Sequence, residues 1–185
     1  IYNHQIVWAE DYKFFIKRNI PNILWLKVWG EEAAEAYYGM RFQHINKIFI
    51  SGYAEDNPDL GDEVLDVLRN VKLLNRKFEW VNPIFSYFTL RVTGKVPQNL
   101  IISNVIQGIR NTLLAHFGKD SPDRLEQVQL HEIYDILNET GYFHIDKRAY
   151  FTVEITGGII EATRLHEMVS IAIDECEIDI TSLAY

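Results

Sequence analysis

The sequence has 185 residues, of which 48% are hydrophobic and 13% aromatic, and its formal net charge is −8. This composition excludes a disordered chain, and the acidic balance argues against a nucleic-acid binder, which needs a basic face to displace counterions from phosphates. No apolar run approaches the roughly 20 residues that cross a bilayer, so we expect no membrane insertion. The single cysteine, Cys176, excludes an internal disulfide and a cysteine-rich metal site.

The first half of the chain predicts alternating helices and strands. Apolar residues recur at helical spacing in two segments, about 9–18 and 60–71. They alternate in two others, which predicts strands at 23–29 and 47–53. Residues 31–40 are ambiguous between a short helix and a loop insertion. Asp59 is expected to cap the second helix, with Asp62 three residues later as a weak form of the capping box.

The second half predicts a long strand at 84–96, followed by the clearest helix at 100–117. Gly118 is expected to end that helix as a left-handed residue, and Gly141 closes a shorter helix at about 130–139. Further strands are expected at 148–155, 169–173 and 178–180. The sum is an α+β fold, with small mixed or antiparallel sheets packed against amphipathic helices. We expect an N-terminal α/β part, 1–96, and a helix pair with C-terminal strands, 97–185; a single domain is the alternative.

Motifs that carry catalysis or bind metals are incomplete in this sequence. His131 and His166 are each followed by glutamate, as in zinc proteases, but the second histidine of that motif is replaced by Asp135 and Ser170. Residues 55–63 have the composition of a calcium loop without its spacing. Cys176 lies between two glutamates, which raise its pKa and make it a poor nucleophile. We therefore expect no enzyme activity, no cofactor and no metal.

The sequence contains more aromatic residues than the cores of the predicted helices and strands require. Most are expected to fill the core, and the rest fit a protein–protein interface, where aromatic side chains act as anchors. The candidates lie away from the obvious core stripes: Trp25, Trp29, Tyr37, Tyr38 and Tyr87. The acidic loop 56–62, with Asp56, Asp59 and Asp62, is a second candidate for docking to a basic partner.

Several segments, taken in order, follow one pattern: Val7 to Tyr12 (VWAEDY), Ile23 to Glu31 with its VWGEE stretch, Asn46 to Ser51, Pro83 with the strand 84–96, Ala115 to Gly118 (AHFG), and Gln129 to Gly141. In this order they resemble the baseplate protein J-like family of contractile phage tails, over about 6–158. The family commonly has threonine before AEDY, whereas this chain has Trp8, so that helix start is expected to be packed rather than capped. Its members are longer, so a chain that opens at Ile1 is expected to be a C-terminal portion.

The resemblance implies a structural role without catalysis. Such proteins resemble baseplate wedge components that form a ring of dimers around the tail hub, and that link the hub to peripheral parts and to sheath initiation. It implies other baseplate subunits as partners, a homodimer or higher ring, and a place in the virion tail baseplate after synthesis in the host cytoplasm. The alternative is an acidic soluble enzyme or small-ligand-binding domain that uses carboxylates and a histidine such as His131 or His144.

Overall fold

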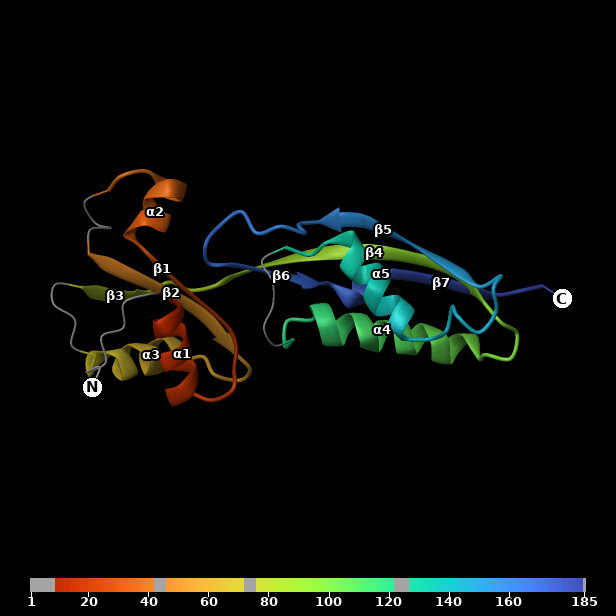
Figure 1. Cartoon of the computed structure of the whole chain (residues 1–185), viewed down its shortest axis with the longest axis horizontal. Helices are drawn as coiled ribbons and strands as arrows, with labels where there is room; N and C mark the ends of the chain where they lie inside the picture. The colour runs from red at the N-terminus through yellow and green to blue at the C-terminus, as the bar shows by residue number, and fades with distance from the viewer. Residues whose placement is uncertain (1–8, 42–45, 72–75, 122–126, 185) are drawn as a thin grey trace. The chain divides into compact units, whose positions relative to one another are not determined.

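The structure, a computed structural model, describes residues 9–41, 46–71, 76–121 and 127–184. The chain divides into two compact units (Figure 1). The first comprises Ile1–Ile84 with Thr163–Glu167, and the second comprises Phe85–Ala162 with Met168–Tyr185. Helices and small mixed sheets build both units, which confirms the predicted α+β class. Whether the units are domains that fold alone stays a prediction.

The first unit is a three-stranded sheet in the order β1-β2-β3, with helices packed on it. β1 and β2 pair antiparallel, whereas β3 runs parallel to β2. The bounds, in chain order, are α1 (Ala9–Asn19), β1 (Ile23–Gly30), α2 (Glu31–Tyr38), β2 (Lys47–Ala54), α3 (Leu60–Arg69) and β3 (Lys77–Trp80). The predicted helices and strands are therefore present, and the ambiguous segment is a helix.

Both faces of the β1–β2 pair are buried. On one face the apolar stripes of α1 and α3 meet the strands in a single core, whose largest fully buried members include Tyr12, Ile16, Ile50 and Leu68. On the other face a smaller cluster contains Trp29, Ala34 of α2, Phe49 and Leu165. Sequence analysis missed β3, because four residues that join β2 from more than 20 positions away leave no local pattern.

The second unit is a sheet built around the long strand β4. β5 pairs with β4 antiparallel, and β6 and β7 pair with its other edge, β7 in parallel. The bounds are β4 (Ile84–Val96), α4 (Ile102–Phe117), α5 (Leu130–Glu139), β5 (Tyr150–Gly158), β6 (Glu167–Ile171), the 3₁₀ helix η2 (Ile173–Glu175) and β7 (Glu177–Ser182). The sequence analysis assigned 84–96 to the N-terminal part, whereas β4 from Phe85 onward falls in the second compact unit, where it pairs with β5, β6 and β7; the domain boundary stays a prediction.

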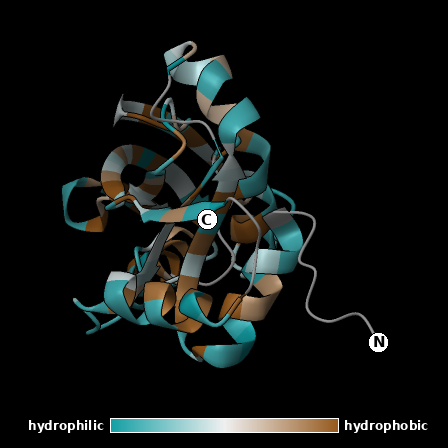
Figure 2. Cartoon of the chain, turned by 90° about the vertical axis from the view of Figure 1, so that its left-hand side faces the viewer, coloured by the Kyte–Doolittle hydropathy of each residue, from teal (hydrophilic) through white to brown (hydrophobic). Residues whose placement is uncertain are grey.

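Helices α4 and α5 pack on one face of this sheet. Alternate residues of β4 are fully buried against them, among them Phe88, Leu90 and Val92, together with Ile109 and Leu113 of α4. Most of the intervening β4 residues, among them Arg91, Thr93 and Lys95, are exposed, as are Glu154 on β5 and Glu177 on β7. Figure 2, which colours the chain by hydropathy, shows both hydrophobic and hydrophilic segments on its helices. The four-residue period of α4 and the two-residue period of β4 thus produce this layer.

Three local expectations need correction, and one lies outside the described residues. Gly118 has φ −68 and extended geometry rather than a left-handed one, and glycine is needed there because a Cβ would clash with the Leu114 carbonyl. Asp59 occupies the N-cap position of α3, but its side chain makes no capping hydrogen bond. Ile173 begins η2 instead of extending a strand. Gly141, with φ 79, closes α5 as expected, while Trp8 is not among the described residues.

The packing of β4 against β5 predicts that Gly94→Ala destabilises the second unit. A Cβ on Gly94 would lie 2.6 Å from the Tyr150 carbonyl oxygen and 3.0 Å from the Phe151 Cβ, so the paired backbone has to move. Such overpacking costs about 1–3 kcal/mol. Native-state hydrogen exchange of the β4 and β5 amides measures it directly. Lys95→Ala, on the exposed side of the same strand, is the matched control and should leave protection nearly unchanged; equal protection in both variants would contradict the packing argument.

Candidate functional site

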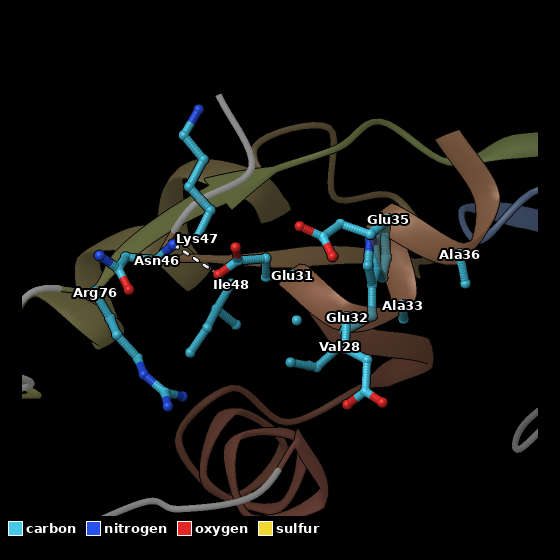
Figure 3. Close-up of a pocket in the computed structure, with 12 residues that line it drawn as sticks. Val28, Glu31, Glu32, Ala33, Glu35, Ala36, Asn46, Lys47, Ile48 and Arg76 are labelled. Carbon is cyan, nitrogen blue, oxygen red and sulfur yellow. Dashed lines mark hydrogen bonds between the residues drawn. The ribbon is translucent and has the colours of Figure 1, made fainter. Parts of the chain in front are cut away.

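The first unit contains an open pocket of about 840 Å³ beside the short helix α2. β1 leads directly into α2 through Gly30, and the antiparallel register places Gly30 opposite Ile48 at the start of β2. The pocket therefore lies between a helix N-terminus and the ends of two paired strands (Figure 3). The residues that line it are Val28, Trp29, Gly30, Glu31, Glu32, Ala33, Glu35, Ala36, Asn46, Lys47, Ile48 and Arg76.

Three of the six polar or charged side chains in the described lining of the pocket are carboxylates of α2, and the others belong to Asn46, Lys47 and Arg76. Glu31 accepts a hydrogen bond from the Asn46 amide at 3.1 Å, the contact drawn in Figure 3. The Lys47 ammonium group forms an ion pair with Glu79 at 3.3 Å, so it is engaged outside the pocket. Among the described residues, Glu32 and Glu35 have no ion-pair or hydrogen-bond partner for their side chains. The helix side of the pocket therefore carries uncompensated negative charge.

The floor of the pocket is apolar. Val28 and Ile48 come from neighbouring strands, and Ala33 and Ala36 add small side chains from α2. In Figure 3, Arg76 and Glu32 lie on opposite sides of Val28 and Ile48. A hollow of this kind, with an apolar floor and charged groups at its rim, has the size of known ligand pockets, roughly 300–1,000 Å³. The sequence analysis did not select these glutamates; the signal was the spacing Glu31, Glu32, Glu35 in a segment of uncertain structure.

The aromatic residues expected at a surface divide into buried and exposed ones. Trp25 and Trp29 are each only 5% exposed, so their expected position away from the core is wrong. The reason is that β1 is covered on both faces, and Trp29 stacks on Phe49 with ring centroids 5.8 Å apart. Tyr37 is 55% exposed, and Tyr38 is also exposed, at the end of α2. A role for any of them in binding stays a prediction.

The remaining predicted contact residues are exposed in separate places. Tyr87 is exposed on β4, in the second unit. Asp56 and Asp59 lie in the loop before α3, and Asp62 lies in its first turn, all of them exposed. The loop is organised by Asn57, whose side chain accepts the Asp59 amide proton at 3.2 Å and donates to Glu63 at 3.3 Å. These contacts explain the loop as a local helix start, and a docking role for it stays a prediction.

The histidines do not form a catalytic or metal-binding group in the described part of the chain. His131 on α5 and His144 after it are both exposed, and both belong to the second unit, whereas the pocket lies in the first. Burial lowers the pKa of His166, whose Nδ1 atom has no hydrogen-bond partner among the described residues. No group of three or more histidine, cysteine, aspartate or glutamate side chains is arranged to hold a metal ion in the residues described.

Cys176 is a structural residue of the second core. It is 6% exposed, its thiol donates a hydrogen bond to the Ala172 carbonyl at 3.4 Å, and its sulfur accepts the Leu90 amide proton at 3.3 Å. Burial is the main cause that raises the pKa of this thiol, and Glu175 adds a smaller contribution. The sequence analysis attributed the raised pKa to both flanking glutamates; Glu177 instead pairs with Arg91 at 2.8 Å.

The exposed face of the second sheet is polar and largely self-compensated. Arg91 on β4 contacts Glu154 on β5 at 3.8 Å and Glu177 on β7 at 2.8 Å. The hydroxyl groups of Thr89 and Thr156 share a hydrogen bond of 2.9 Å across the β4–β5 pair. Cross-strand pairs of this kind stabilise the sheet and leave little net charge to attract a ligand.

Comparison with known proteins is sparse. No family model matches the sequence, and no curated protein matches it at a significant level. Among solved structures, a chain of the anti-feeding prophage (AFP) baseplate is similar, with 9% sequence identity and a TM-score of 0.49. The similarity covers 84% of this chain and 35% of that chain, so this chain spans about a third of its length. A similarity of this degree does not establish a common function. Within the described residues, no helix is both long and apolar enough to cross a membrane.

The buried thiol predicts how stability depends on pH. Because the pKa of Cys176 is raised in the folded chain, the folded state holds its proton more tightly than the unfolded state. Stability from this group is therefore complete below the unfolded pKa and is lost as pH rises through the folded pKa. Urea denaturation between about pH 7 and pH 10 should show falling stability above about pH 9, with a shallower fall in Cys176→Ala. An identical slope in both proteins would contradict this assignment.

Proposed function

We propose that this chain is a structural component of a contractile-tail baseplate, or of a related contractile injection machine, and that it acts through protein–protein contacts. The order of its motifs supports this proposal. The segments that resemble the baseplate protein J-like family fall on helices and strands of the structure, such as α1, β2, β4 and α5. Each segment matches the start, the end or the whole of such an element. In the proposed role the chain belongs to a wedge or ring, and its partners are further copies and neighbouring baseplate subunits.

The observation that carries the proposal is an exposed apolar patch at the end of α2, formed by Tyr37, Tyr38 and Met40 and called here the α2 patch. Met40 is 86% exposed, and the two tyrosine rings lie 6.3 Å apart. Adjacent tyrosines cannot both face a core from one helix, and the only fully buried residue of α2 is Ala34. Tyrosine and methionine are enriched in protein interfaces, where their burial contributes most of the binding energy.

The turn at Gly39, which follows α2, keeps the α2 patch at the surface. Gly39 follows α2 with φ 78, a backbone conformation that glycine adopts without strain, and its amide donates to the Glu35 carbonyl at 2.9 Å. The turn ends the helix and leads to Met40. A partner that covers the α2 patch would remove large apolar side chains from water without any rearrangement of the first core.

The proposed mechanism is geometric rather than chemical. A stable protein contact buries about 800 Å² on each partner, so the α2 patch would be the centre of a larger interface. Symmetric pairing is the commonest way in which one patch closes on a second copy, and a homodimer would be the unit that repeats in a ring. The exposed aspartates of the loop before α3 offer a second surface for a basic neighbour.

Mass spectrometry of purified contractile tails from the source of this sequence tests the proposal. The chain should be present in stoichiometric amount relative to other baseplate proteins. A triple variant, Tyr37→Ser/Tyr38→Ser/Met40→Ser, expressed in place of the wild type, should accumulate in cells but be at least about tenfold depleted from tails, because loss of anchors removes several kcal/mol of binding energy.

The matched control is Ile145→Ser, which removes an exposed apolar side chain from the second unit. This variant should enter tails at the wild-type level. Absence of the wild-type chain from purified tails would overturn the proposed function. Equal incorporation of the triple variant would leave the baseplate role intact and show that the α2 patch is not the interface.

A further inference from the structure

We infer that the pocket beside α2 is a docking site for a segment of a partner protein in which an apolar side chain is flanked by arginine or lysine. The inference rests on the proposed function only in that the occupant is part of a partner protein. It concerns a different surface from the α2 patch, because the α2 residues that line the pocket lie between Glu31 and Ala36, whereas the patch follows them.

The apolar part of the occupant is specified by the pocket floor. Val28 is half-buried and Ile48 is buried, and both line the pocket together with the small side chains of Ala33 and Ala36. Ile48 is already only 4% exposed, so an apolar side chain placed there would remove from water its own surface and that of Val28, Ala33 and Ala36. A purely hydrophilic ligand would desolvate this floor without compensation.

The basic part of the occupant is specified by charge complementarity. Three carboxylates from α2 line the pocket, Glu31, Glu32 and Glu35, and two of them lack any partner among the described residues. The described lining also holds two basic residues: Lys47, which is paired with Glu79, and Arg76, which lies across Val28 and Ile48 from Glu32 (Figure 3). The negative charge left for an occupant is therefore that of Glu32 and Glu35 on the helix side. Arginine is the best match for such groups because its planar guanidinium binds carboxylates in a bidentate manner and carries charge at any physiological pH.

The size and openness of the site favour a chain segment over a small cation. At about 840 Å³, the pocket is large enough for several side chains, and the carboxylates are spread over more than one turn of α2. Every lining residue that the structure describes belongs to the first unit. A segment that spans the floor and both glutamates would combine apolar burial with two ion pairs.

NMR titration of the full 185-residue chain tests the inference. The probe is a capped heptapeptide in which one leucine lies between two arginines, with glycine and serine at the ends. It should shift the amide signals of pocket residues such as Val28, Gly30, Ala36 and Ile48. The Glu32→Gln/Glu35→Gln variant should bind it about three- to tenfold more weakly at low salt, because exposed ion pairs contribute modestly and are screened.

Two further peptides and one variant make the test specific. Replacement of leucine by serine, or of both arginines by glutamate, should abolish detectable binding. Glu55→Gln, which removes one exposed negative charge elsewhere in the first unit, is the matched control and should bind like the wild type. The signal dispersion of each variant verifies that it is folded.

The inference is overturned if no basic–apolar peptide binds at about 5 mM, which corresponds to a free energy too small for a useful contact. Equal binding of the acidic peptide, or equal weakening by Glu55→Gln, also overturns it. If arginine amide alone binds as tightly as the peptide, the pocket is a small-cation site. Tail composition does not enter this experiment, so chains found in tails that bind no peptide would disprove the docking site and leave the proposed function standing.

Discussion

The antiparallel pairing of β1 with β2 is the constraint on which the first unit depends. The pair is buried on both faces, so its two side-chain sets serve two different clusters. The even-numbered residues meet α1 and α3, while Trp29 and Phe49 stack on the opposite face. Since a shift of one residue in register would exchange these sets, both clusters hold the register in place.

This pairing also decides where the candidate sites lie. Gly30 is the last residue of β1, and its register opposite Ile48 fixes the direction in which α2 leaves the sheet. Ala34 is the only residue of α2 that is buried in the first unit. The other side chains of this short helix are therefore available for binding. Short side chains at 33, 34 and 36 allow the helix to approach the strands, while the glutamates line the hollow beside it and the tyrosines end in solvent.

The second unit follows a simpler rule, because one strand organises it. β4 buries alternate side chains under α4 and α5, and all the remaining strands of its sheet, β5, β6 and β7, pair with it. On its exposed side, Arg91 pairs across the strands with Glu154 and Glu177. The two units therefore differ in their polar surfaces. The first has a hollow where Glu32 and Glu35 have no partner among the described residues, and the second has a sheet face on which Arg91 is paired in this way.

The sequence by itself determined the elements whose signal is local. The two-residue alternation in β4 and the four-residue repeat in α4 are long enough to identify their type and their buried face, and the α+β class follows from them. Gly141 was predicted to close α5 from its place after the helix pattern, and it does so with φ 79, whereas the same local signal at Gly118 gave the wrong backbone conformation.

Tertiary structure alone decided what depends on partners distant in sequence. β3 exists because it pairs with β2, and Trp25 and Trp29 are buried because β1 is covered on both faces, which alternation along a strand cannot reveal. The raised pKa of Cys176 comes mainly from burial rather than from its neighbours in sequence. The pocket likewise needs Glu32, Ile48 and Val28 to meet across a strand pair and a helix, and that proximity is set by packing, not by spacing along the chain.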